Sequence, residues 1–105
     1  MNLKLYNSSV SLKLNNEDRL KLNKVGDYIS EKIILPNTSI TVTLKITEQN
    51  DFYYESDHFI FTMKLEDFLN MKQNITKEGY SFKKNDCTAN IAIDIFVKRK
   101  KKNVN

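Results

Sequence analysis

The side chains best suited to chemistry are few and scattered. His58 is the only histidine and Cys87 the only cysteine of the 105 residues, so a His/Cys metal cluster cannot form within one chain. A Cys–His dyad for nucleophilic catalysis would require the two side chains to meet. Cys87 lies on the apolar row of a predicted strand, which favours a buried structural cysteine. His58 begins another predicted strand, and we interpret it as an ordinary strand-end residue rather than a ligand or general base.

Phosphate-binding loops and the common hydrolase signatures are missing from the sequence. The two glycines, Gly26 and Gly79, lie far apart, and neither G-x-S-x-G nor G-x-x-x-x-G-K occurs. No acidic residue stands two positions before a lysine, the spacing that many metal-dependent nucleases use. A scattered carboxylate pair is the one hydrolase alternative that stays open. We therefore expect no enzymatic activity, no metal and no cofactor.

A short aromatic run flanked by carboxylates is the strongest candidate binding site. We predict a loop here. In one interpretation it is a solvated hairpin loop whose rings turn inward. In the other it is a protein-contact surface, because tyrosine and phenylalanine bury much area at low entropic cost. The candidate protein-binding residues are Asp51, Phe52, Tyr53, Tyr54, Glu55 and Asp57.

A basic run near the C-terminus is the second candidate. Removing its five positive charges from the net charge of +4 leaves −1 for all other residues, so the basic character belongs mainly to this tail. The run is either a solvated end or a contact for phosphates, anionic lipid or an acidic protein surface. It contains no aromatic residue, unlike the platforms that bind single-stranded nucleic acid. Its residues are Lys98, Arg99, Lys100, Lys101 and Lys102.

Alternation of apolar and polar residues dominates the rest of the chain and predicts strands. The clearest strand, residues 40–47, has Val42, Leu44 and Ile46 on one face. Residues 15–18 between two apolar stretches predict a hairpin loop, and residues 36–37 predict a turn. The other expected strands cover residues 3–5, 10–14, 20–22, 59–63 and 87–97, with residues 28–35 less regular.

One segment changes to helical period. Leu65, Phe68, Leu69 and Lys72 fall at i, i+3, i+4 and i+7, which predicts a short amphipathic helix over about residues 64–74. The expected fold is α+β: a mainly antiparallel twisted sheet with this helix packed on one face, forming one domain over residues 1–97 with a tail at 98–105. The predicted core residues are Leu44, Phe61, Phe68, Leu69, Ile91, Ile93 and Ile95.

The sequence also predicts a compartment. The first residues contain no apolar signal-peptide region, and no apolar run approaches the ~20 residues needed to span a bilayer. A single cysteine cannot form an intrachain disulfide. We therefore expect a cytoplasmic protein in a reducing environment.

Residues 57–69 resemble a unit found in small bacterial immunity proteins. Their sequence is Asp-His-Phe-Ile-Phe-Thr-Met-Lys-Leu-Glu-Asp-Phe-Leu. In that family, which includes the partners of contact-dependent and wall-associated toxins, an alternating strand runs directly into a helix and further strands follow. The layout is similar over residues 40–98. The resemblance implies an α+β fold that occludes a toxin protein. Immunity proteins against nucleases are often strongly acidic, whereas this body is near neutral, which disfavours a nuclease target.

Two classes of function follow. The first is a non-enzymatic module that binds and inhibits a partner protein, either a toxin or, for a phage-encoded inhibitor, a host defence protein. The second is a nucleic-acid-associated accessory protein that uses the basic tail. A small enzyme with a scattered carboxylate site is the third and weakest interpretation.

Overall fold

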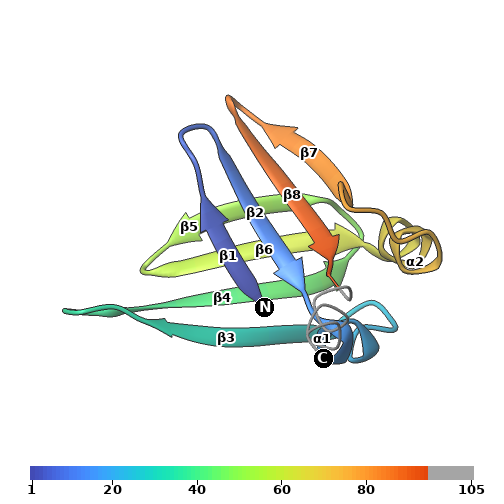
Figure 1. Cartoon of the computed structure of the whole chain (residues 1–105), viewed down its shortest axis with the longest axis horizontal. Helices are drawn as coiled ribbons and strands as arrows, with labels where there is room; N and C mark the ends of the chain where they lie inside the picture. Colours follow the sequence, from blue (N-terminus) through green and yellow to red (C-terminus); the bar gives the residue numbers. More distant parts are fainter. Residues whose placement is uncertain (95–105) are drawn as a thin grey trace, which may run out of the picture.

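Strands dominate residues 1–94, the part of the chain that the computed structural model describes (Figure 1). The mixed α+β class is therefore confirmed. Ile95 and the basic tail lie outside the described residues. In chain order the elements are β1 (Asn2–Leu5), β2 (Ser9–Leu14), α1 (Asn16–Leu20), β3 (Tyr28–Ile34), β4 (Ser39–Thr47), β5 (Asp51–Glu55), β6 (His58–Lys64), α2 (Leu65–Gln73), β7 (Tyr80–Lys84) and β8 (Cys87–Ile93).

The strands form two sheets, not the one sheet that we expected. Sheet A has the order β1-β2-β8-β7, and sheet B has the order β3-β4-β6-β5. Each sheet joins two antiparallel hairpins through a central parallel pair, β2 with β8 and β4 with β6. The single-sheet prediction was wrong because alternation shows that each strand buries one face without showing which strands are hydrogen-bonded neighbours.

The apolar faces of the two sheets pack against each other and form the core. Leu12 and Ile91, which are paired in sheet A, and Leu44 and Phe61, which are paired in sheet B, are all fully buried. These and other buried residues form one continuous apolar cluster. Face-to-face packing of two sheets thus provides the cover that we had assigned to the helix alone. Burial is confirmed for Leu44, Phe61, Phe68, Ile91 and Ile93.

The predicted hairpin loop at residues 15–18 is instead the start of helix α1. The Asn15 side chain accepts a hydrogen bond from the Asp18 N–H at 2.8 Å, and the Asp18 carboxylate accepts one from the Asn15 N–H at 3.0 Å. This reciprocal capping box satisfies two backbone donors that a helix start leaves free. Asn and Asp favour caps as much as loops, so residue type alone did not separate them. The strand predicted over residues 20–22 is accordingly absent, although Leu22 is buried.

Asp18 also ties the start of the chain to the body. The Met1 ammonium lies 3.0 Å from the Asp18 carboxylate and 3.0 Å from the Glu31 carboxylate of β3. Burial of this ammonium by itself would lower its pKa, but the hydrogen bonds to Glu31 and Asp18 outweigh that effect and raise the pKa above its usual value. These two contacts join the residue before β1 to α1 and to β3 of sheet B.

Helix α2 lies within one residue of the predicted bounds, but its position and its buried face differ from the prediction. Figure 1 shows α2 at one end of the two sheets, where β6 ends and the chain turns toward β7, and not on the face of a sheet. Phe68 and Met71 are its buried residues, whereas Leu69 is 37 % exposed and was wrongly placed in the core. An element at the end of a sandwich buries a narrower stripe than a helix lying flat on a sheet. No helix within residues 1–94 has the length and apolarity to cross a lipid bilayer.

Phe68 and Leu69 test this orientation of α2, because Phe68 lies in its buried stripe and its neighbour Leu69 lies outside that stripe. We expect Phe68→Ala to lower the free energy of unfolding by about 3–5 kcal/mol, because it empties a fully buried site. The matched variant Leu69→Ala should cost less than about 1 kcal/mol. Urea denaturation followed by circular dichroism measures both. Equal losses for the two variants would contradict the observed helix face.

Candidate functional site

The candidate aromatic segment is a strand, not the loop that we predicted. Residues Asp51–Glu55 form β5 at an edge of sheet B, with Tyr53 opposite Ile60 and Tyr54 opposite Phe59 of β6. The connecting loop contains only Ser56 and Asp57, whose φ angles of 51° and 62° are those of a tight two-residue hairpin turn. Aromatic residues on both faces of β5 hide its alternation, which explains the error.

Strand geometry separates the three aromatic residues. Phe52 faces the core, is 8 % exposed, and stacks on Phe61 with ring centroids 5.8 Å apart. Tyr53 points to the outer face of sheet B and is 40 % exposed, whereas Tyr54 is on the inner side and is 50 % exposed. Phe52 therefore belongs to the core, and only the two tyrosines remain accessible to a partner.

A lysine from sheet A binds at the edge of β5 that faces away from β6. The Lys84 ammonium lies 2.8 Å from the Asp51 carboxylate, donates a hydrogen bond to the Phe52 carbonyl at 3.1 Å, and sits 5.6 Å from the centre of the Tyr53 ring. The Phe52 N–H donates to the Asp51 carboxylate at 2.8 Å. The hydrogen bond from Lys84 outweighs the opposing effect of burial and lowers the pKa of Asp51. Both backbone groups of Phe52 on the free side of β5 are thus occupied.

Tyr54 is held by the turn that follows it. Its hydroxyl donates a hydrogen bond to the Asp57 carboxylate at 2.8 Å, and its ring centre lies 4.8 Å from that of Phe59. The hydrogen bond to Asp57, with a smaller effect of burial, raises the pKa of Tyr54. Glu55, the remaining predicted residue, is exposed. The structure therefore brings Tyr54 and Asp57 together and places Tyr53 with Asp51 on the other side.

His58 belongs to a polar chain that the sequence did not reveal. Its Nε2 lies 2.7 Å from the Thr43 hydroxyl, which in turn lies 2.5 Å from the Ser30 hydroxyl. Thr43 stands between the imidazole and the serine, and its hydroxyl has a hydrogen-bond partner on each side. The arrangement satisfies a buried hydroxyl on the outer face of sheet B. Finding it would have required the cross-strand register, which the sequence does not encode locally.

Cys87 and His58 do not meet. Cys87 is half-buried, packs against the core cluster, and belongs to sheet A, whereas His58 lies on the outer face of sheet B. Within residues 1–94, no three His, Cys, Asp or Glu side chains are grouped to hold a metal ion.

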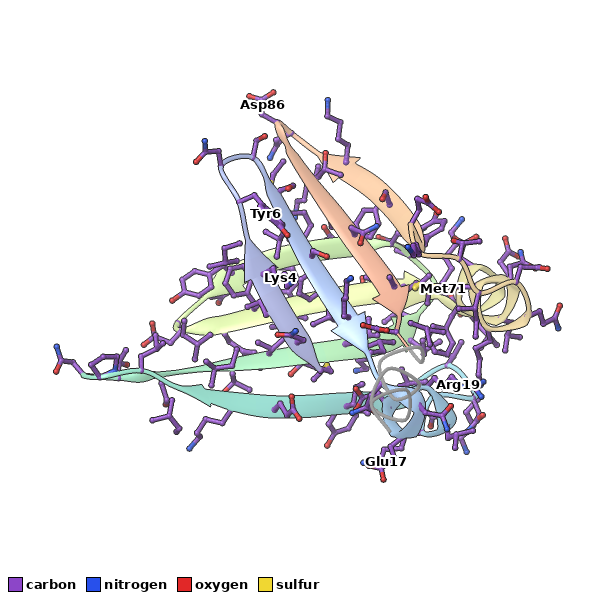
Figure 2. The ribbon with its side chains drawn as sticks, viewed as in Figure 1. Lys4, Tyr6, Glu17, Arg19, Met71 and Asp86 are labelled. Carbon is purple, nitrogen blue, oxygen red and sulfur yellow. The ribbon has the colours of Figure 1, made fainter. Side chains whose placement is uncertain are left out.

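The outer face of sheet A carries lysines and small polar residues. The register places Lys4 beside Ser11 and Lys83 beside Thr88 on the side away from the core, and Lys4 and Tyr6 mark the β1 hairpin in Figure 2. Among the strand residues of this face within residues 1–94 there is no Asp or Glu. The predicted basic-tail residues, 98–102, lie outside the described part. The face consists of Asn2, Lys4, Ser9, Ser11, Lys13, Ser81, Lys83, Thr88, Asn90 and Ala92.

Comparison with known proteins adds no relative. No family model matches the chain, and no curated protein matches it in sequence. The similarity of residues 57–69 to immunity proteins therefore stays a prediction.

The Asp51–Lys84 contact leads to a prediction about pH. Because the pKa of Asp51 is lowered in the folded state, its stabilising effect is present above the unfolded value of about 3.9 and is lost as pH falls through the folded value. At pH 7, Asp51→Asn should lower the free energy of unfolding by about 0.2–1 kcal/mol, the range for a solvent-exposed ion pair.

Urea denaturation of wild type and Asp51→Asn between pH 7 and pH 2.5 measures this difference. It should begin to shrink as the pH falls below about 3.9 and should close once the pH has passed the lowered pKa of the folded state, because the wild-type carboxyl is then neutral in both states. Glu55→Gln, on the same strand, is the control and should have no measurable effect. A difference that persists undiminished at the lowest pH would contradict the electrostatic explanation.

Proposed function

We propose that this protein is a non-enzymatic module that binds a partner protein and blocks it, as immunity proteins block toxins. The partner is a toxin or, for a phage-encoded inhibitor, a defence protein. The observation that carries this proposal is the end of the β5–β6 hairpin, where Tyr53 and Tyr54 are exposed on opposite faces of one edge strand beside Glu55 and Asp57.

The two tyrosines have properties of interface anchors. Tyr54 is held by its hydrogen bond to Asp57 and by the Phe59 ring, and Tyr53 is packed beside the Lys84 ammonium. Rings that are already ordered lose little conformational entropy on binding. Because they lie on both faces of β5, a partner that contacts both must enclose this edge in a concave surface. The exposed carboxylates favour a basic partner and increase its association rate.

The order of elements also supports the immunity interpretation. Strand β6 (His58–Lys64) runs without a loop into α2 (Leu65–Gln73), and β7 and β8 follow. This is the strand-into-helix layout that the resemblance implies.

Tyrosine truncation tests the proposed contact surface. We expect Tyr53→Ala and Tyr54→Ala each to weaken partner binding about thirtyfold, because truncation of an aromatic anchor commonly costs ~2 kcal/mol. The tagged full chain is used to capture proteins from its native cell, and mass spectrometry compares the variants with wild type. Tyr28→Ala, a 62 % exposed tyrosine on β3 at the opposite edge of sheet B, is the control and should capture normally.

The captured partner then provides the functional assay. Expression of the partner alone should arrest growth of a host cell if the partner is a toxin, or protect the cell against phage if it is a defence protein. Co-expression of this chain should reverse the effect. Wild-type capture by both tyrosine variants, with circular dichroism showing that they are folded, would place the interface elsewhere. A captured partner whose activity is unchanged by this chain would contradict inhibition.

A second candidate is an accessory role on nucleic acid. The outer face of sheet A favours it, because Lys4, Lys13 and Lys83 project there among strand residues that include no carboxylate. Lysines on one face of a sheet form a surface that attracts phosphates without reading sequence. The tail at residues 98–102 would add five positive charges to such a contact.

Salt-dependent retention on immobilised DNA and RNA tests this second role. We expect the double variant Lys4→Gln/Lys83→Gln to elute at lower salt than wild type, and deletion of residues 98–105 to lower the elution salt further. Each lost phosphate contact reduces the slope of log affinity against log salt by about 0.9 for duplex DNA. Lys45→Gln, an exposed lysine of sheet B, is the control. Equal retention of all four proteins would argue against a nucleic-acid contact at these sites.

A further inference from the structure

One backbone edge of strand β1 pairs with no other strand within residues 1–94. The Tyr6 N–H donates to the Ser9 carbonyl at 2.9 Å, so these two residues form a hydrogen-bonded pair in the β1–β2 ladder. In an antiparallel ladder, hydrogen-bonded and non-hydrogen-bonded pairs alternate. Lys4 is therefore bonded to β2, and the N–H and C=O groups of Leu3 and Leu5 point the other way. No described residue forms a backbone hydrogen bond with these four groups.

The inner face of sheet B extends beyond this edge and is apolar there. Figure 1 shows β5, β6 and the β3–β4 hairpin continuing past β1. The sheet register gives this overhang an apolar surface, which we call the shelf and define as Ile33, Ile40, Tyr54 and Phe59. Tyr54 is 50 % exposed and the other three are half-buried, whereas Val42, on the same face and covered by sheet A, is 1 % exposed.

We propose that β1 accepts an extended segment of a partner protein as an added strand of sheet A. The added strand would pair with the free groups of Leu3 and Leu5 and would cover the shelf with every second side chain. This rests on the proposed function, that the chain binds a protein, and it specifies how the partner is held. Addition of a strand to an exposed edge combines backbone hydrogen bonds with pockets for alternate side chains.

The other edges are less suited to such a strand. The free side of β5 is closed at Phe52 by Asp51 and Lys84. The same ladder alternation, applied to β7, leaves the backbone groups of Ser81 and Lys83 free, so a lysine is itself one of the two residues that would pair, and lysine at such a position discourages pairing. Strand β3 has a free side as well, but Lys32 lies in it. At β1 the two residues with free groups, Leu3 and Leu5, are both apolar, and the shelf lies beside them.

A second copy of this chain does not fit the same place. If another β1 paired antiparallel with this one, the sheet B of each copy would extend under the other, and the two overhanging sheets would occupy the same space (Figure 1). The occupant is therefore a single extended segment with little bulk on its inner side.

Charge specifies the chemistry of that segment. The side chains of the added strand that point away from the shelf would lie on the lysine-bearing outer face of sheet A, beside Lys4. Carboxylates at these positions would meet positive charge. The partner segment should thus alternate apolar residues, which face the shelf, with acidic or small polar residues, which face solvent.

A synthetic peptide tests this inference. The probe is a capped peptide of about seven residues that alternates valine with glutamate or threonine, and its control has the same composition in an order without alternation. NMR titration of the full-length protein should show saturable binding of the alternating peptide, slower amide exchange at Leu3 and Leu5, and shifts at the shelf residues. The control peptide should bind at least about tenfold more weakly.

Paired variants locate the site. Leu5→Pro removes an N–H that points away from β2, so the hairpin should persist while peptide affinity falls about tenfold or more. Ser81→Pro makes the same change on the β7 edge and should leave affinity unchanged. For the shelf, Ile33→Ser should weaken binding by a similar factor, whereas Ile34→Ser, its 73 % exposed neighbour on the other face, should not.

Several results would overturn the proposal. These are absence of saturable binding at millimolar peptide, equal affinity for both peptides, protection at β3 or β7 in place of Leu3 and Leu5, or normal affinity in both Leu5→Pro and Ile33→Ser. Concentration-dependent protection of Leu3 and Leu5 without peptide, with sedimentation showing a dimer, would assign the edge to a second copy. Tyr53 lies outside the shelf, so Tyr53→Ala should bind the peptide normally. Loss of partner capture by Tyr53→Ala, with peptide binding unchanged, would therefore test the proposed function separately from strand addition at β1.

Discussion

The mutual burial of two apolar sheet faces is the constraint on which the rest of the structure depends. Leu12 and Ile91 of sheet A and Leu44 and Phe61 of sheet B have no exposed surface. Neither sheet could keep such a face in contact with water. Because sheet A pairs residues 9–14 with residues 88–93, it assembles only when the ends of the described chain meet around the inserted sheet B. Such distant contacts favour slow, cooperative folding.

Each four-stranded sheet has two edge strands, and these edge strands differ in the groups that they offer to a partner. On β5, Lys84 and Asp51 occupy the backbone groups of Phe52, so this edge presents side chains to a partner. On β1 the backbone groups of Leu3 and Leu5, beside the apolar overhang of sheet B, have no backbone partner in the described part of the chain. Natural proteins usually protect edges with charge or cover. An edge that combines such backbone groups with apolar surface therefore favours binding of an extended partner segment.

Helix α2 is held by polar contacts that join both sheets. The Asn50 amide donates to the Asp67 carboxylate at 3.0 Å and to the Tyr80 hydroxyl at 2.9 Å, and Tyr80 donates to Asp67 at 3.1 Å. Burial, and then the hydrogen bond to Asp67, raises the pKa of Tyr80. The Lys72 ammonium donates to the Leu22 carbonyl at 3.1 Å, which connects α2 to the segment after α1. These contacts fix the helix at the end of the sheets and so determine which of its residues are buried.

The sequence by itself determined the elements with a strong local pattern and left their assembly open. The alternation of residues 40–47 predicted β4, and the i, i+3, i+4 spacing predicted α2, because each pattern depends on residues close in the chain. Whether Leu69 or Met71 was buried, and whether Tyr53 and Tyr54 shared a face, depended on neighbours distant in sequence. The division into two sheets, the His58–Thr43–Ser30 chain and the shelf beyond β1 depend on register and packing between strands up to 79 residues apart. Local chemistry records which face of an element is apolar, but only the tertiary structure decides what covers that face.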